Sequence, residues 1–445
     1  MGRRKLLSLA ELLNRTCSVL AMTPEDTELN AWLLSETVAN GMVTGCRKHM
    51  RRLNSLHILR TFLLVFALTL SAHLPVLAVS GPPLRTGLWV TQKISEAAAD
   101  PAAFEAAVRG NPHLSGVCLA TGWKEIEKEP GKPDFSSIDK AVAVLRRIGM
   151  KYELGIKPGV DAPPFVYQQG AQSFETQIRN PHRPNFGAAV TIPVPWDPKY
   201  QENFSRIIAR LGERYSSDPL CVSVVLTCAN FMSKEMHLPK TPEDRAKWST
   251  MGDYGPKLLS VYKKYTDEWA KAFPKQQVTL HLSQVLNLPP SFFEGVIEYG
   301  LSKYPERFTI QNCQLTGRRE DTGSLSYDLI QKYQDRAHHG FQSVAGFGHG
   351  GERMGSIEMA TLNVVHANGE YWELWHGDGM KPQTSAAIES AWQEAKKLGY
   401  DGYKEKLITG GRYQEQSGGG HRRKGRRGRR NGLESDPRMR LKESM

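Results

Sequence analysis

Short apolar runs alternate with amphipathic stretches along the chain from residue 86 to residue 398. The runs have the length of β-strands, and residues 221–226 form the near-continuous apolar run that is typical of a parallel strand buried on both faces. The stretches between them repeat apolar residues at helical spacing, as residues 137–148 do before Gly149 ends the pattern. Strands are predicted at residues 86–90, 114–120, 152–156, 221–226, 277–282, 308–311, 342–345 and 370–375. Helices are predicted at residues 101–109, 137–148, 199–214, 255–273, 290–304, 326–338, 356–367 and 384–398.

Eight strands and eight helices in strict alternation predict a parallel sheet. Eight such units in this length favour a closed α/β barrel, the (β/α)8 or TIM-barrel fold, as a single domain over residues 81–411. An open doubly wound sheet is less favoured, because no glycine-rich nucleotide-binding motif follows any predicted strand. A proline-rich loop after the third strand, residues 157–197, is expected to form an ordered cover over the barrel mouth.

The formal charge of +12 is concentrated at the two ends of the chain. Residues 1–80 hold nine Lys and Arg against five Asp and Glu, and residues 412–445 hold eleven against four. The body between them carries about +1, so the sequence predicts no specific nucleic-acid partner. Residues 412–445 are expected to be a disordered basic tail, which either contacts anionic polymers or is simply solvated.

Residues 60–79 form an apolar segment that follows basic residues and ends in small residues up to Ser80. This pattern predicts a secretory signal peptide over residues 50–80, with an uncleaved membrane anchor as the alternative. Residues 1–49 are expected to be a disordered upstream extension ahead of a true start at Met50. The protein is therefore expected to be extracytoplasmic, that is, secreted, periplasmic or membrane-anchored.

Neither the cysteines nor the histidines have the spacing of metal ligands, so neither a metal nor a cofactor is expected. Cys221 and Cys228 bracket one predicted strand and would lie roughly 20 Å apart, too far for a disulfide. The four cysteines of the predicted barrel are expected to be small buried residues in strands. They are Cys118, Cys221, Cys228 and Cys313.

The segment after the second predicted strand contains Trp123, Glu127, Gly131, Phe135 and Asp139 in order. With the proline-bearing loop after the third strand, this pattern resembles the barrel glycoside hydrolases, and family-42-type β-galactosidases most, over residues 115–165. The resemblance implies a (β/α)8 fold with its site at the carboxyl ends of the strands. It also implies cleavage of O-glycosidic bonds in an oligosaccharide or polysaccharide by paired carboxylates.

Those hydrolases carry Asn-Glu after strand 4, with the Glu as general acid/base. The matching residues here are Asn230 and Glu235, which are separated by four residues. The family nucleophile is a Glu at the end of strand 7, where this chain has no carboxylate. Glu352, further along that loop, and Glu373, on the eighth strand, are the candidates for the second role. Glu235 with Glu373 would suit the wider spacing of an inverting enzyme.

Aromatic and polar residues near the predicted strand ends are expected to bind the sugar. An indole ring stacks on the apolar face of a pyranose, and its hydroxyls need polar partners. The expected substrate-binding residues are Trp123, Asn230, His237, Gln311, Asn312, His349, Trp372, Trp375 and Asp378.

Two alternatives to a hydrolase remain open from the sequence. The missing strand-7 glutamate favours a non-catalytic carbohydrate-binding barrel. The basic tail favours a structural surface protein that docks on an anionic polymer.

Overall fold

The computed structural model describes residues 83–181, 185–318, 324–347 and 354–409. All of them belong to one compact unit, residues 80–445. The predictions for residues 1–49, 50–80 and 412–445 lie outside the described residues. Among the helices of the described ranges, none is both long and apolar enough to span a membrane.

Eight parallel strands close into a barrel, which confirms the predicted (β/α)8 fold. Each strand pairs with its neighbour in the chain, and the first pairs with the last through Leu88 and Trp372, so the ring has no edge. The strands are β1 (Gly87–Lys93), β2 (Leu114–Gly122), β5 (Lys151–Lys157), β8 (Cys221–Val225), β9 (Gln277–Leu282), β10 (Phe308–Leu315), β11 (His338–Ser343) and β12 (Tyr371–Leu374).

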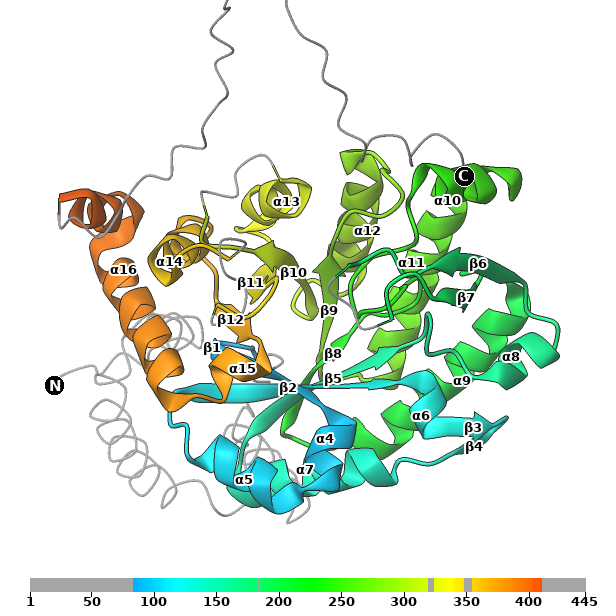
Figure 1. Ribbon diagram of the computed structural model, residues 1–445, viewed down its shortest axis with the longest axis horizontal. Coiled ribbons are helices and arrows are strands. Elements are labelled where there is room, and N and C mark those ends of the chain that lie inside the picture. Colours follow the sequence, from blue (N-terminus) through cyan, green and yellow to red (C-terminus); the bar gives the residue numbers. More distant parts are fainter. Residues whose placement is uncertain (1–82, 182–184, 319–323, 348–353, 410–445) are drawn as a thin grey trace, which may run out of the picture. The chain divides into compact units, whose positions relative to one another are not determined.

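Helices surround the strands, as Figure 1 shows. In α7, the predicted apolar face is buried, and Gly149 ends the helix in the left-handed conformation, with φ 69°. The long helices are α5 (Pro101–Arg109), α7 (Ser136–Ile148), α9 (Pro198–Tyr215), α11 (Tyr254–Ala272), α12 (Pro290–Lys303), α13 (Leu325–Tyr333), α14 (Ile357–His366) and α16 (Pro382–Thr409). Shorter helices follow several strands: α4 (Ile94–Ala99), α6 (Trp123–Ile126), α8 (Pro164–Gln168), α10 (Pro242–Thr250) and α15 (His376–Gly379).

The seventh strand and its preceding helix correct the sequence prediction. The helix ends at Tyr333 rather than residue 338, and the strand begins at His338 rather than residue 342. The inner face of this strand includes Gly340, where a Cβ would lie 2.5 Å from the Tyr371 ring. A glycine is therefore required by packing at a position that lacks any apolar strand signal.

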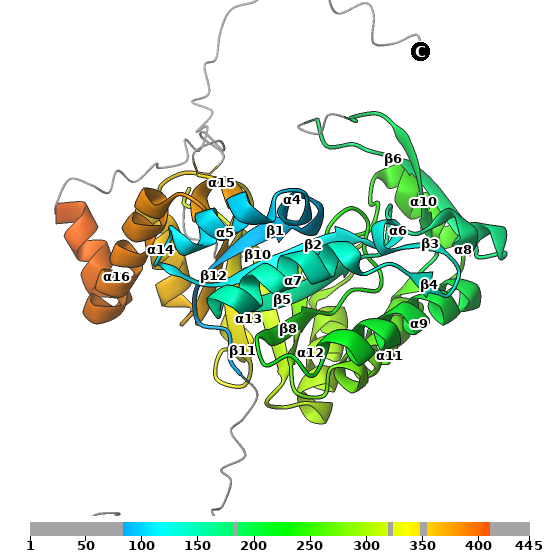
Figure 2. The same cartoon turned by 90° about the horizontal axis from the view of Figure 1, so that it is seen from below.

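The loop after β5, predicted to be an ordered cover over the mouth, contains regular structure in its described residues, 158–181 and 185–197. It forms a hairpin of β6 (Ser173–Gln177) and β7 (Ala189–Pro193). Phe174 of this hairpin stacks on Trp248 of α10, with 3.8 Å between ring centroids. Figure 2 shows β6 beside α10 at one side of the barrel. The chain just beyond β6 reaches the barrel mouth, where Arg179 and Asn180 contribute to its wall.

The four barrel cysteines are buried and unpaired, and three of them lie in strands as predicted, whereas Cys228 lies in the loop after β8.

Candidate functional site

A hollow of about 880 Å³ lies at the carboxyl ends of the strands. Its wall includes residues from the ends of β1, β2, β5, β11 and from the loops after β8 and β12. This is the end at which (β/α)8 enzymes place their chemistry. The hollow is therefore the candidate site.

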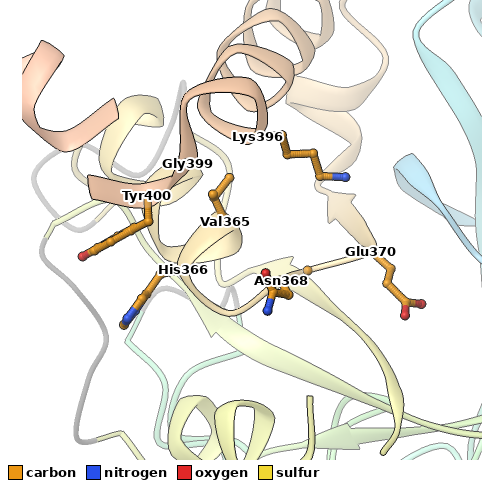
Figure 3. Close-up of a pocket in the computed structure, with 8 residues that line it drawn as sticks. Val365, His366, Asn368, Glu370, Lys396, Gly399 and Tyr400 are labelled. Carbon is orange, nitrogen blue, oxygen red and sulfur yellow. The ribbon is translucent and has the colours of Figure 1, made fainter. Parts of the chain in front are cut away.

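A second, smaller hollow of about 390 Å³ lies between α14, the turn before β12 and α16 (Figure 3). Its wall includes His366, which stacks on Tyr400 with 4.2 Å between ring centroids. The Tyr327 hydroxyl lies 2.8 Å from Nδ1 of His366, at hydrogen-bonding distance. This hollow adjoins the amino-terminal end of β12. Barrels of this fold place their chemistry at the opposite, carboxyl ends of the strands, so we assign the smaller hollow no chemistry.

Directly beneath the mouth, the barrel interior holds four buried charges. Arg85 comes from the segment before β1, Glu153 from β5, Glu373 from β12 and Lys234 from the loop after β8. The Arg85 guanidinium donates to Glu153, and its Nη2 lies 3.5 Å from Glu373. Lys234 Nζ lies 3.1 Å from Glu373 and 3.7 Å from Glu153. Two cations and two anions thus neutralise one another in what we call the barrel ion network.

Arg85 also fills the part of the interior nearest the amino-terminal end. Its guanidinium lies 3.9 Å from the centroid of the Tyr371 ring and 4.6 Å from that of Trp89. Nη2 donates to the Cys118 sulfur at 3.2 Å. Cys118, Glu153 and Glu373 are the one group of potential metal ligands within the described residues, and Arg85 contacts all three. The positive charge at this position therefore comes from the protein itself.

Two glycines allow the loop after β8 to reach the interior. A Cβ on Gly155 would lie 2.5 Å from Cδ of Lys234. A Cβ on Gly159 would lie 2.1 Å from the carbonyl oxygens of Asn230 and Phe231. The sequence thus removes side chains from the end of β5 where Lys234 and its loop must pass.

Burial and charge act in opposite directions on this network. Burial alone would raise the pKa of Glu373, but the charges of Lys234 and Arg85 hold that pKa well below its ordinary value. Burial alone would lower the pKa of Lys234, but Glu373 and Glu153 raise it above its ordinary value. Burial and the Lys234 charge lower the pKa of His281 far below its usual range, so the imidazole is neutral.

A pH dependence of stability follows from the lowered pKa of Glu373. The native state binds a proton at Glu373 less readily than the unfolded chain does. The stabilisation by the ionised carboxylate is therefore present above an unfolded pKa of about 4.3 and is lost as pH falls below that value. We expect the difference in unfolding free energy between wild type and Glu373→Gln to shrink by about 1.4 kcal/mol per pH unit below it. Denaturant titrations at pH 7, 4 and 3 measure this. A difference that stays constant over that range would show that the pKa of Glu373 is the same in the native and unfolded states.

Glu373 does not face the hollow, and this corrects the catalytic role expected for it. Its side chain is fully buried. It accepts from Thr91 at 2.8 Å, from Gln311 at 3.1 Å and from Lys234. Thr91 and Lys234 both line the hollow, so Glu373 lies one layer below it. In this geometry the Glu373 carboxylate is out of contact with the hollow and holds the Lys234 ammonium instead.

The loop after β8 brings together three predicted residues. Glu235 and His237 line the hollow, whereas Asn230 is buried and shapes the loop. Asn230 accepts from the Cys228 amide at 2.7 Å and donates to the Glu235 carbonyl at 2.6 Å. The His237 ring stacks on Phe231, with 5.7 Å between centroids. Glu235 itself is half-buried and occupies the wall of the hollow.

Of the three predicted tryptophans, one reaches the hollow. Trp375 is 40% exposed, lines the hollow, and donates its indole N–H to the Ser343 carbonyl at 2.7 Å. Trp123 is fully buried, donates to Glu127 and packs on Phe204. Trp372 is fully buried against Trp392. Both buried indoles are part of the packing outside the strands, which corrects the sugar-stacking role expected for them.

The remaining predicted residues are dispersed. Gln311 belongs to the barrel interior, where it donates to Glu373. Asn312 is buried and accepts from the Gln314 amide at 2.7 Å. Asp378 is buried and accepts from the Phe347 amide at 2.6 Å. None of these three lines the hollow. His349 and Glu352 lie outside the described residues.

Sequence reasoning missed Glu125, an exposed residue of α6 that lines the hollow. It accepts from Thr121 at 2.6 Å. The neighbouring Glu127, part of the pattern shared with the hydrolases, is instead buried and accepts from the Gly131 amide and from Arg206. The spacing of residues in the sequence does not distinguish Glu125, which faces the mouth, from Glu127, which holds a turn two residues later.

Comparison with known proteins gives similarity in fold alone. No protein-family profile and no curated sequence matches the chain. The β-galactosidase of the psychrophilic Marinomonas ef1 matches at 11% identity and a TM-score of 0.47, over 72% of this chain and 61% of its own. The β-galactosidase of the Antarctic haloarchaeon Halorubrum lacusprofundi matches at 14% and 0.45, over 69% and 58%. A psychrophilic family 10 endo-β-1,4-xylanase matches at 10% and 0.39, over 65% and 86%.

This chain therefore spans about three fifths of the length of the two β-galactosidases. Because one fold hosts many activities, the function has to be argued from the side chains of the hollow.

Proposed function

We propose that this protein binds a saccharide in the hollow at the barrel mouth and hydrolyses an O-glycosidic bond there. The observation that supports this is the pair of carboxylates on its wall, Glu125 after β2 and Glu235 after β8. A third carboxylate, Asp244, is buried and accepts from Thr176 and from the Thr241 amide in the cap of α10. Its oxygens serve the fold, which leaves two carboxylates for chemistry.

Hydrolysis of a glycoside needs one carboxyl to protonate the leaving oxygen and another to activate water or attack the sugar. We assign the proton donor to Glu235, because it is half-buried in the loop that also holds the Phe231–His237 stack and is the less exposed of the two. Glu125 is exposed, so water reaches it readily, and we assign it the water-activating role. This replaces the predicted partnership of Glu235 with Glu373.

Turnover and binding by the wild-type chain test the proposal. We expect release of reducing ends from at least one polysaccharide or aryl glycoside in a broad panel. Trp375→Ala should raise KM about tenfold, because the exposed indole buries apolar surface against the sugar ring. Leu398→Ala, which removes an exposed apolar side chain of α16 outside the hollow, is the control and should leave KM unchanged. A chain that neither binds nor cleaves any saccharide in the panel would contradict the proposal.

A non-catalytic saccharide-binding barrel is the second candidate. Glu373 is enclosed in the barrel ion network, and residues 344–347, the described part of the segment after β11, contain no carboxylate. Binding that depends on Trp375, without turnover of any panel member, would favour this candidate over the hydrolase.

We also propose, from residues 50–80 alone, that the protein acts outside the cytoplasm. Amino-terminal sequencing of protein recovered from the host should then begin just after Ser80 if the segment is a cleaved signal peptide.

A further inference from the structure

The charged side chains on the wall of the hollow are mostly cationic. Five are Lys or Arg and three are carboxylates. Asp244 serves the cap of α10, and the other two carboxylates are those assigned to chemistry. The cations are Lys93, Lys157, Arg179, Lys234 and Lys240.

Three of these cations lie beside carboxylates of the protein. Lys234 belongs to the barrel ion network, Lys93 lies 2.7 Å from Glu96, and Lys157 lies 3.0 Å from Asp161. Asp161 is shared, since Lys124 also lies 3.1 Å from it. Lys124 and Lys157 therefore share a single carboxylate at this side of the mouth.

Arg179 and Lys240 remain, and neither is in an ion pair within the described residues, although the charge of Glu235 acts on Lys240 and the charge of Arg179 acts on Glu243. Arg179 is exposed just beyond β6. Lys240 is half-buried in the loop after β8, and its ammonium donates to the Gln284 carbonyl at 3.3 Å. Burial and the charge of Arg245 lower the pKa of Lys240, while Glu235 on the wall of the same hollow acts in the opposite direction. A half-buried ammonium that no carboxylate contacts directly is stabilised when an anion joins it.

We propose that the saccharide bound in this hollow is acidic, and that Arg179 and Lys240 bind a carboxylate of a uronic acid residue. The inference rests on the proposed function, because it names the substrate class of the same hollow. Guanidinium and ammonium groups form charge-assisted hydrogen bonds to carboxylates, and cations at a cleft also draw an anionic ligand towards it. Neutral sugars would gain nothing from either group beyond an ordinary hydrogen bond.

Calorimetric titration of the full chain with tetrasaccharides tests the inference. The probes are tetragalacturonate, its neutral counterpart galactotetraose, and a κ-carrageenan tetrasaccharide, which carries sulfate but no carboxylate. The variants are Arg179→Gln, Lys240→Gln and the double substitution. Lys199→Gln with Arg210→Gln is the matched control, since both residues are exposed on α9 in ion pairs outside the hollow. The basic tail is present in every variant, so its binding of anions cancels in the comparison.

We expect the double substitution to weaken tetragalacturonate binding at least tenfold and to change galactotetraose binding less than twofold. Raising salt should weaken tetragalacturonate binding by wild type more than by the double variant. Equal affinity of wild type and double variant for tetragalacturonate would overturn the acidic-substrate inference, while galactotetraose binding would leave the proposed function standing. Dependence on the two cations for the sulfated probe alone would overturn the uronic acid assignment. Binding of none of the three would contradict the proposed function itself.

Discussion

Arg85→Met should lower the free energy of unfolding by about 3–5 kcal/mol, the cost of leaving buried charge without its partner. The substitution keeps an unbranched, flexible side chain but shortens it and removes the charge that lies between Glu153 and Glu373. Lys234 alone would then face two buried carboxylates. The loss also includes the contacts of the guanidinium with the rings of Tyr371 and Trp89. Denaturant unfolding at pH 7 measures the change.

The matched control is Arg147→Met. Arg147 pairs with Glu105 at 2.6 Å, but its side chain is 59% exposed. Exposed pairs contribute less than about 1 kcal/mol, so this variant should unfold close to wild type. A loss for Arg85→Met no larger than that of Arg147→Met would show that the barrel ion network contributes little to stability.

The fold was readable from the sequence because buried parallel strands and amphipathic helices each leave a periodic pattern. The seventh unit shows where this reading fails. The chain from His338 to Ser343 has few apolar residues because its inner face needs Gly340 beside Tyr371 and Gln342 in the polar interior. Tertiary packing, not local preference, makes this segment a strand.

The candidate site was readable only in part. Glu235, His237 and Trp375 were found because position after a strand places a residue near the mouth. Whether a side chain at a strand end points inward or outward depends on register, and that separated Trp375 from Trp372. The ion network did leave a signal, namely charged residues such as Glu153 and Glu373 within otherwise apolar strands. Their partners Arg85 and Lys234 lie far away in sequence, so only the closed ring reveals the pairing.

The ion network also links the interior of the barrel to the loop that carries Glu235. Lys234, the residue directly before Glu235, pairs with Glu373 and packs against Gly155, where no side chain blocks it. Asn230 fixes the carbonyl of Glu235 from within the same loop. The backbone on both sides of Glu235 is therefore anchored to buried groups, as a proton donor that must keep one position requires.

Glu235→Gln should lower kcat by about 10²–10⁴-fold on a saccharide substrate, because the amide cannot protonate the leaving oxygen. Binding in the hollow should change less than threefold, since glutamine keeps the shape of the side chain. Glu202→Gln, which removes an exposed carboxylate of α9 outside the hollow, is the control and should leave kcat unchanged. Steady-state kinetics together with calorimetric binding of the same substrate measure both effects.

The leaving group separates a proton donor from a residue that only supports the loop. A dinitrophenolate departs without protonation, so a dinitrophenyl glycoside should lose far less rate in Glu235→Gln than a saccharide does. A merely structural role would lower both rates by the same factor. Glu373→Gln provides that comparison, because its buried carboxylate positions Lys234 and lies outside the hollow. Equal losses on the two substrates in Glu235→Gln would exclude Glu235 as the general acid and leave Glu125 as the carboxylate to test.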